Sequence, residues 1–322
     1  MSAPIVSVVI PSYSHARFIG EAVDSVLGSS FKDLELVIVD DGSTDDTLDV
    51  LVPFRADPRV TIQAQENRGA HAAINVGLAL SGSPILFILN SDDAYQPDRI
   101  ARMVGAFNAD PKLVIAASWI DVVNAEGTSM GIKEGFRNMP PWPPPSQGPL
   151  LSEVGDAELA LLEANFVSTT SNVAFRRSLI DDHGLDFLPL RYTHDWDFIL
   201  SACRHGEFRL IEEPLVRYRV HGDNTIREGQ DRAKGEMRFE VMWTAIRHAR
   251  SMGSRKVASG LASADLENRM WRSLPRFGCE TLLAQLLTLR GPEEDPPGAY
   301  DALLEPAHPF RVAAVETLSA VP

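Results

Sequence analysis

Two pairs of adjacent carboxylates, each directly after an apolar run, are the residues best suited to chemistry in this sequence. Asp40 and Asp41 follow "LELVIV", and Asp92 and Asp93 follow "ILFILNS". Adjacent carboxylates repel one another, and a buried charge without a partner costs free energy, so each pair needs a positive group nearby. Carboxylate oxygens bind divalent cations that bridge phosphates, and they accept hydrogen bonds from a base or a ribose. The two pairs therefore predict a site for a nucleotide and a metal ion.

The elements that must position these acids are strands alternating with helices. Strands are expected at 5–11, 34–40, 59–65, 84–90 and 112–120, and helices at 17–29, 44–54, 69–81 and 97–107. This alternation predicts an α/β fold with a mainly parallel central sheet flanked by helices. Ligands bind at the carboxyl ends of such strands, so Tyr13, just past the first strand, should lie beside both acidic pairs. Its ring could stack on a base.

The bulk composition excludes several classes of protein. The chain has 322 residues and a net charge of −14, and this acidity argues against nucleic acid as the main partner. No apolar stretch approaches the 18 residues that a transmembrane helix needs, and the N-terminus lacks the basic region of a signal peptide. Two distant cysteines, Cys203 and Cys279, indicate a reducing compartment. We therefore expect a cytoplasmic protein, with peripheral contact with the inner face of the membrane as an open alternative.

The charge distribution suggests a division of the chain near residue 225. Residues 1–225 contain 17 Lys and Arg against 31 Asp and Glu, whereas residues 226–322 contain 13 of each. The proline-rich segment 139–149 is expected to be a loop. We predict a catalytic domain at 1–225, with a nucleotide-binding half at 1–120 and an acceptor-binding half at 121–225, and a helical extension at 226–322.

The extension contains an apolar stripe at helical spacing, formed by Phe239, Met242, Ile246 and Ala249. Three interpretations remain open for this stripe. It could pack on the catalytic domain, bury against a second copy in a homodimer, or, because basic residues flank it, lie on a membrane surface. Packing within the protein is favoured, since every helix in a folded protein buries an apolar face.

Five segments in order now carry a resemblance to a known family. They are "VVIPSYSHARFIGEAVDSVL", "ELVIVDDGSTDDT", "ENRGAHAAINVGL", "FILNSDDAYQPDRI", and "HDWDF" followed by "YRVHGDN". Together, over about residues 4–225, they resemble the family-two glycosyltransferases, inverting enzymes with the GT-A fold. The resemblance implies a nucleotide-diphosphate sugar donor, with a UDP-sugar favoured over a GDP- or dTDP-sugar, and a divalent metal, Mn²⁺ or Mg²⁺. It also implies a glycan or lipid-linked acceptor and a role in bacterial polysaccharide assembly.

The resemblance also implies roles for individual residues on the donor side. Pro11 and Tyr13 would flank the base, Asp40 would contact it, and Asp41 would support Asp40. Arg68 would reach the base or a phosphate. Structural alternatives remain open for four of them: Asp40 and Asp41 could be turn residues, Tyr13 could simply pack, and Arg68 could be a surface arginine.

For the metal and the reaction, the resemblance implies a second set of roles. Asp92 would contact the ribose or donor sugar, Asp93 would bind the metal, and His221 would be a second metal ligand or a diphosphate contact. Asp195 in "HDWD" would be the general base, because an acceptor hydroxyl must lose its proton as it attacks. His194 and Trp196 beside it would belong to the acceptor region.

The sequence departs from the family pattern at two positions. Asn90 stands where the family often has an acid, and His194 stands where it often has Glu. We expect Asn90 to remove no direct metal ligand and His194 to alter the acceptor or the pKa of the base. Two rival functions remain: a non-catalytic nucleotide-sugar-binding protein, and a sugar nucleotidyltransferase, which the absence of glycine in "PSYSHARF" disfavours.

Overall fold

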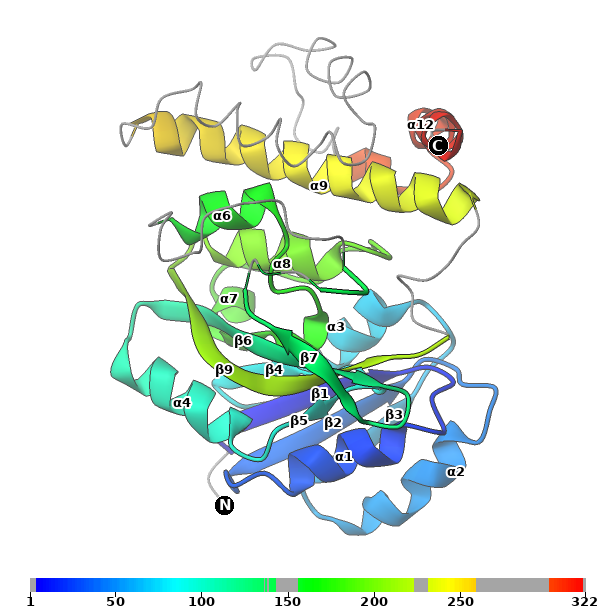
Figure 1. The fold of residues 1–322 in the computed structure, drawn as a ribbon, viewed down its shortest axis with the longest axis vertical. Helices are drawn as coiled ribbons and strands as arrows, with labels where there is room; N and C mark the ends of the chain where they lie inside the picture. The colour runs from blue at the N-terminus through cyan, green and yellow to red at the C-terminus, as the bar shows by residue number, and fades with distance from the viewer. Residues whose placement is uncertain are drawn as a thin grey trace.

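The computed structural model of the chain describes residues 4–135, 137, 139–142, 156–222, 231–258 and 301–320. A nine-stranded mixed sheet lies at its centre, with helices on both faces (Figure 1). The strand order is β3-β2-β1-β4-β8-β6-β9-β5, and β7 pairs with β6. The predicted α/β class is confirmed. Most of the predicted loop at 139–149, Cys279 and a large part of the predicted helical extension at 226–322 lie outside the described residues.

The N-terminal half of the sheet is parallel, as the sequence predicts. β1 pairs in parallel with both β2 and β4, and β2 pairs in parallel with β3. The strands are β1 (Val6–Ser12), β2 (Leu34–Asp40), β3 (Val60–Ala64) and β4 (Ile85–Ile88). They are connected by α1 (Ile19–Leu27), α2 (Thr47–Leu51) with the short 3₁₀ helix η1 (Val52–Ala56), and α3 (Ala70–Leu80).

The second half of the sheet is mixed. β8 lies between β4 and β6 and is antiparallel to both, while β6 runs parallel to the long strand β9. β7 is antiparallel to β6, and β5 is antiparallel to β9. The elements are β5 (Ala94–Tyr95), α4 (Arg99–Ala109), β6 (Leu113–Asn124), β7 (Ser129–Lys133), η2 (Thr170–Asn172), β8 (Ala174–Arg176), α7 (Ser178–Asp181) and β9 (Glu207–Val220).

Alternate residues of the strands face two hydrophobic clusters, one on each side of the sheet. Val8 and Ile10 pack with α1 and α4, whereas Val9 faces α3 and the C-terminal helices. The small residues of α3 allow it to approach the sheet closely. A Cβ atom on Gly77 would lie 2.3 Å from Cγ1 of Val9, so no larger residue fits there without movement.

The C-terminal helices form a layer beside the sheet, with α9 lying across α6 and α8 in Figure 1. The predicted apolar stripe of Phe239, Met242, Ile246 and Ala249 is buried in the core of this chain, which confirms packing within the protein. It is therefore covered without a second copy or a membrane. These helices are α6 (Ala157–Glu163), α8 (His194–Ala202), α9 (Asp231–Ala258), the 3₁₀ helix η5 (Asp301–Leu304) and α12 (Pro309–Ser319).

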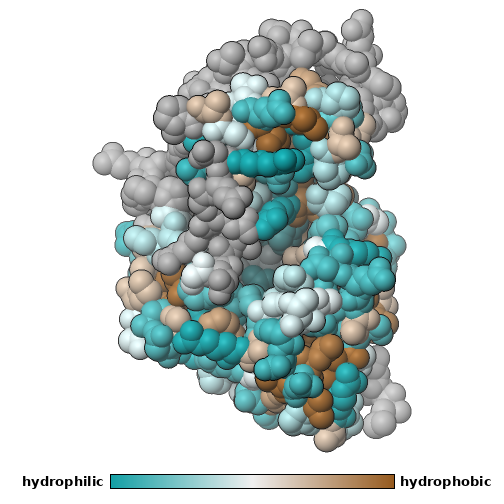
Figure 2. Space-filling view, turned by 90° about the vertical axis from the view of Figure 1, so that its right-hand side faces the viewer, coloured by the Kyte–Doolittle hydropathy of each residue, from teal (hydrophilic) through white to brown (hydrophobic). Residues whose placement is uncertain are grey.

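Among the described residues, no helix combines the length and the apolar character needed to cross a membrane. The face drawn in Figure 2 is largely hydrophilic, with small apolar groups near its two ends. The exposed large apolar residues of the described part are spread over several elements, and only Met130 and Ile132 share one, the strand β7; the others are Ile5, Tyr13, Val52, Leu80 and Val312. Scattered residues of this kind are normal on a globular surface and indicate no interface.

Candidate active site

The loops after β1 and β2 meet at the carboxyl edge of the sheet, as predicted. Ser12 and Asp40 are partners in the parallel register at the ends of the two strands. Beyond them, the Ser14 amide donates to Oγ of Ser43 at 2.8 Å, and the Ala16 amide donates to Oδ2 of Asp45 at 3.0 Å. Ser14 adopts a positive φ of 50°, which turns the chain back toward the second loop. The two loops therefore form one surface.

The two acids after β2 have different surroundings. Asp40 is buried and accepts hydrogen bonds from the amide and the hydroxyl of Ser43. Asp41 accepts at one oxygen from the Arg68 amide at 2.9 Å and at the other from the Gly69 amide at 2.7 Å. Asp41 thus anchors the loop between β3 and α3, which brings Arg68 to the same edge as Asp40.

The other predicted donor residues also lie at this edge. Pro11 is buried within β1, whereas the ring of Tyr13 is 48% exposed just beyond the strand. The guanidinium of Arg68 is exposed and donates to Oε1 of Gln65 at 3.2 Å. Tyr13 and Arg68 therefore present an accessible aromatic ring and an accessible cation.

Asp92, His221 and His15 form a cluster with the chemistry of a metal site. One ligand atom from each lies within 4.8 Å of the others, and Asp92 Oδ2 is 3.0 Å from Nε2 of His221. Burial alone would raise the pKa of Asp92, but the His221 hydrogen bond and the nearby charge of His15 outweigh it and lower the pKa. The carboxylate is therefore held in its ionised form, as a metal ligand must be.

The ring of His15 is fixed by a neighbour in the same acidic motif. Its Nδ1 lies 2.7 Å from Oγ of Ser91. Metal-binding histidines are commonly oriented by a hydrogen bond at one ring nitrogen, while the other nitrogen binds the ion. The carboxylate is a ligand type that Mn²⁺ and Mg²⁺ both accept, whereas the two imidazoles favour a transition metal, so this donor set fits Mn²⁺ better than Mg²⁺.

Asp93, the predicted metal ligand, faces protein groups instead. Its Oδ1 accepts from the Arg219 amide at 2.9 Å, and its Oδ2 accepts from Oγ of Ser171 at 2.5 Å. Burial, together with the charge of Asp92, raises its pKa well above the ordinary value, so the neutral acid is favoured. Asp92 therefore belongs to the cluster with His15 and His221, while the assignment of Asp93 as the metal ligand stays a prediction.

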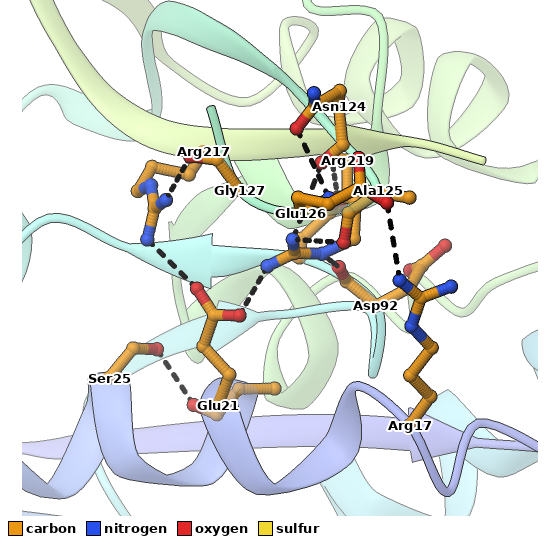
Figure 3. Close-up of polar contacts among 12 residues, drawn as sticks. Arg17, Glu21, Ser25, Asp92, Asn124, Ala125, Glu126, Gly127, Arg217 and Arg219 are labelled. Atoms are coloured by element: carbon orange, nitrogen blue, oxygen red, sulfur yellow. Dashed lines mark hydrogen bonds and ion pairs between the residues drawn. The ribbon is translucent and has the colours of Figure 1, made fainter. Parts of the chain in front are cut away.

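Arg219 joins the elements around the turn that carries Asp92 and Asp93, which we call the acidic turn (Figure 3). Its guanidinium is 3% exposed and donates to the carbonyl of Asp92 at 3.0 Å, to the carbonyl of Ala125 at 3.1 Å and to the carboxylate of Glu21 on α1. Arg217 reaches the other oxygen of Glu21 at 2.8 Å. Because Arg219 contacts the backbone of Asp92 and its amide binds Asp93, it fixes the turn that carries both acids.

We expect Arg219→Gln to destabilise the protein by about 2–4 kcal/mol, because it removes a buried cation and leaves carbonyl groups without donors. Arg217→Gln is the matched control, since it removes the other cation paired with Glu21 from a more exposed position and should cost only about 0–1 kcal/mol. Urea denaturation followed by circular dichroism measures both. Equal losses would show that the buried turn does not depend on Arg219.

A pocket of about 230 Å³ opens beside the cluster. Its lining includes His15, Arg17, Phe18, Asp45 and His221. Arg17 lies near its rim, where its exposed guanidinium pairs with Glu126 at 3.5 Å (Figure 3). An exposed ion pair of this kind is weak, so Arg17 can exchange Glu126 for an anionic ligand.

A short segment before β8 connects the acidic turn to the predicted base. The amide of Asn90 donates to Oγ of Ser171 at 2.9 Å, and its side chain donates to Thr169 at 3.2 Å. The side chain of Asn165, a few residues earlier, donates to Oδ2 of Asp195 at 3.4 Å. Asn90 therefore supports this segment, and its effect on metal binding stays a prediction.

Asp195 lies in the first turn of α8 and is 6% exposed. Its Oδ1 accepts from the Trp196 amide at 2.7 Å. Burial raises the pKa of Asp195, and the opposing effects of the His194 charge and of these hydrogen bonds do not cancel the shift. A carboxylate with a raised pKa is a stronger base, which suits proton removal from a hydroxyl.

The two neighbours of Asp195 are held by the protein. Nδ1 of His194 lies 3.1 Å from the carbonyl of Leu190, which only accepts, so this nitrogen carries a proton. The other ring nitrogen lies 3.0 Å from the hydroxyl of Thr170. Trp196 is 4% exposed and donates to the Leu161 carbonyl at 2.7 Å, so its ring packs in the core, and its place in the acceptor region stays a prediction.

Sequence reasoning missed His15 and Arg219. Both residues lie in segments that carry the family resemblance, His15 in "PSYSHARF" and Arg219 in "YRVHGDN", but the sequence indicates no role for either. The partners of Arg219 in α1 and in the turn after β6 are distant in sequence.

Comparisons with known proteins agree with this geometry. A family model described as "Glycosyl transferase family 2" matches residues 7–184, more than half of the chain. An uncharacterized glycosyltransferase of Nostoc sp. is 30% identical over 223 residues, which cover 68% of this chain and 66% of that protein. The chondroitin synthase of Escherichia coli is 30% identical over 240 residues, which cover 74% of this chain but only 32% of the synthase.

Solved structures share the fold at low sequence identity. The crystal structure of S. aureus TarS in complex with UDP-GlcNAc has a TM-score of 0.62 and 17% identity, covering 98% of this chain and 89% of that chain. The mannosyltransferase PcManGT from Pyrobaculum calidifontis, in complex with GDP-Man and Mn²⁺, has a TM-score of 0.56 and 19% identity, covering 99% of this chain and 85% of that one.

Proposed function

The chain belongs to glycosyl transferase family 2 and has the predicted GT-A-type fold, and on this basis we propose that it transfers a sugar from a nucleotide-diphosphate sugar to an acceptor hydroxyl with inversion. The observation that carries the proposal is that one segment contacts both the acidic turn and Asp195. Residues 165–172 contact the acidic turn at Asn90 and Asp93 and also contact Asp195. A metal–diphosphate site and a base are thus supported by the same loop.

The donor is proposed to bind along the loops after β1 and β2. Tyr13 and Pro11 would flank the base, Asp40 would contact it, and Arg68, held by Asp41, would reach the base or a phosphate. We favour a UDP-sugar over a GDP- or dTDP-sugar. The TarS complex with UDP-GlcNAc supports a uridine donor, while the PcManGT complex with GDP-Man keeps guanosine as the competing result.

Asp92, His221 and His15 would hold the divalent metal, Mn²⁺ or Mg²⁺. When bound there, the ion supplies positive charge that stabilises the departing nucleotide diphosphate. Asp93 and Arg219 position Asp92, and Ser91 orients His15. With one carboxylate and two imidazoles, this site relies on the donor phosphates to complete the coordination.

Asp195 is proposed as the general base. The hydroxyl of the acceptor has a pKa far above 7, so its proton must leave as the oxygen attacks the donor sugar. Asn165 and the Trp196 amide orient the carboxylate of Asp195. A single attack from the face opposite the leaving group inverts the anomeric centre.

A glycan or lipid-linked acceptor in bacterial polysaccharide assembly remains our proposal for the physiological setting. The similarity to chondroitin synthase and to the hyaluronan synthase of Pasteurella multocida, 28% identical over 223 residues, supports it, although this chain spans about a third of the first and a fifth of the second. The division at residue 225, and the division at 120 between donor and acceptor halves, stay part of the same proposal.

Turnover of nucleotide sugars tests the proposed function. We expect the protein to release UDP from one member of a panel of UDP-sugars with Mn²⁺ present and to lose at least 100-fold in rate with excess EDTA. The anomeric configuration of the product, read by nuclear magnetic resonance, should be opposite to that of the donor. Binding of UDP without turnover of any donor would instead indicate a non-catalytic nucleotide-sugar-binding protein.

A further inference from the structure

Helix α9 contacts the chain both before and after Asp195, at residues 191–193 and at Asp197. We propose that four residues on one face of α9, namely Glu240, Thr244, Arg247 and His248, are positioning residues that set the catalytic base. This inference rests on the proposed function, because it assigns the C-terminal extension a role in that same reaction. Residues 240, 244, 247 and 248 recur at the spacing of a single helical face, so one helix presents all four together.

Glu240 holds the backbone just before α8. It is fully buried, and its two oxygens accept from the Arg191 amide at 2.9 Å and from the Tyr192 amide at 2.7 Å. Arg311 of α12 lies 3.6 Å from Oε1 and supplies a nearby positive charge. Both carboxylate oxygens are therefore used on two consecutive amides, which defines the direction in which the chain enters α8.

The remaining contacts fix the start of α8 itself. Oγ1 of Thr244 lies 2.9 Å from Oγ1 of Thr193, the residue directly before the helix. Arg247 and His248 both donate to Oδ1 of Asp197, at 2.6 and 2.8 Å. Asp195 thus lies between Thr193 and Asp197, and both of these residues are held by hydrogen bonds to α9.

The tautomer of His248 follows from its second partner. Arg204 donates to Nδ1 of His248 at 2.6 Å, so the proton of the neutral ring is on Nε2, which faces Asp197. Burial lowers the pKa of His248 despite the opposing effect of Asp197, and this keeps the ring neutral near pH 7. Arg204, on the turn after α8, therefore ties the far end of that helix to α9 as well.

Stability alone does not account for this arrangement. Buried ion pairs contribute little net stability, and apolar residues of similar volume often give an equally stable interface. The same helix already buries an apolar stripe against the core. Directional hydrogen bonds instead fix orientation, and small displacements of a catalytic group can cost about 100-fold in rate. The hydrogen bonds from these four residues of α9 to residues 191–197 are therefore best explained as a means of fixing the position of Asp195.

The test compares Glu240→Gln with Glu236→Gln in the full chain. Glu236 lies one turn earlier on α9 and pairs with Arg232 at 3.6 Å, so it provides the same chemical change without contact with α8. We expect Glu240→Gln to lower kcat at least 10-fold with an unchanged donor KM and an unchanged thermal shift with UDP and Mn²⁺. Glu236→Gln should behave as wild type, and Glu240→Asp should recover part of the loss.

A second variant covers the case in which Glu240→Gln fails to fold. Arg247→Gln changes a partly exposed side chain and should show the same selective loss of kcat. Folded variants of Glu240 or Arg247 that keep kcat within twofold of wild type would overturn the inference while leaving the proposed function intact. A wild-type protein that binds UDP but transfers no sugar would overturn the proposed function, and the inference with it.

Discussion

Asp195→Asn is expected to reduce sugar transfer by about 10²–10⁴-fold, the contribution typical of a general base. The replacement keeps the size of the side chain, and its amide oxygen can still accept from the Trp196 amide, so the fold should be preserved. What is lost is the ability to take a proton from the acceptor hydroxyl. Single-turnover measurement of product with saturating donor measures the effect.

Nucleotide binding should survive this substitution, since Asp195 contacts Asn165 and Trp196 and not the acidic turn. The thermal shift produced by UDP and Mn²⁺ should therefore match that of wild type. Asp182→Asn, which changes an exposed carboxylate after α7, is the control for the chemical change alone. Transfer by Asp195→Asn within tenfold of wild type would exclude Asp195 as the base.

Asp92→Asn is expected to abolish metal-dependent nucleotide binding and to lower kcat/KM by about 10²–10³-fold, the scale seen when stabilisation of a developing negative charge is removed. Asp92 is the carboxylate of the candidate metal cluster and is held in its ionised form. An amide of the same size binds a divalent cation far more weakly. Titration of Mn²⁺ in the presence of UDP, followed calorimetrically, measures the loss.

Asp93→Asn is the matched comparison, because it distinguishes two adjacent acids. Burial and the neighbouring charge favour the neutral form of Asp93, which an asparagine imitates. We therefore expect this variant to bind Mn²⁺ and UDP nearly as wild type does, with at most a modest loss of stability. If Asp93→Asn lost the metal response and Asp92→Asn kept it, the predicted ligand would be Asp93 after all.

Local patterns predicted the elements and the edge of the sheet where the candidate site residues lie. Apolar runs of strand length, each ending in polar residues, marked β1, β2 and β4, and parallel pairing then brought Tyr13, Asp40 and Asp92 together. The stripe on α9 could also be predicted, because apolar residues with a period of 3.6 indicate a helix with one buried face. These features depend on residues that are close together in the sequence, so a single sequence is enough to predict them.

Long-range contacts could not be predicted in the same way. The choice between Asp92 and Asp93 depends on how the turn sits against Arg219 of β9, more than 120 residues away. The insertion of β8 between β4 and β6 is a non-local pairing with no local signal. The hydrogen bonds from the Arg191 and Tyr192 amides to Glu240 likewise join distant segments. In the sequence alone, Glu240 looks like part of an ordinary polar helix face.

We propose that the carboxyl edge of the sheet binds a nucleotide diphosphate through a metal held by Asp92, His221 and His15. The most direct test of this claim is the melting temperature of the wild-type protein with UDP, GDP and dTDP, each with Mn²⁺ or with EDTA, because a ligand of the folded state raises stability by mass action. We predict a small shift with Mn²⁺ alone, none with UDP and EDTA, and a large shift with UDP and Mn²⁺ together. Shifts of equal size with EDTA and with Mn²⁺, or none with any nucleotide, would contradict the claim.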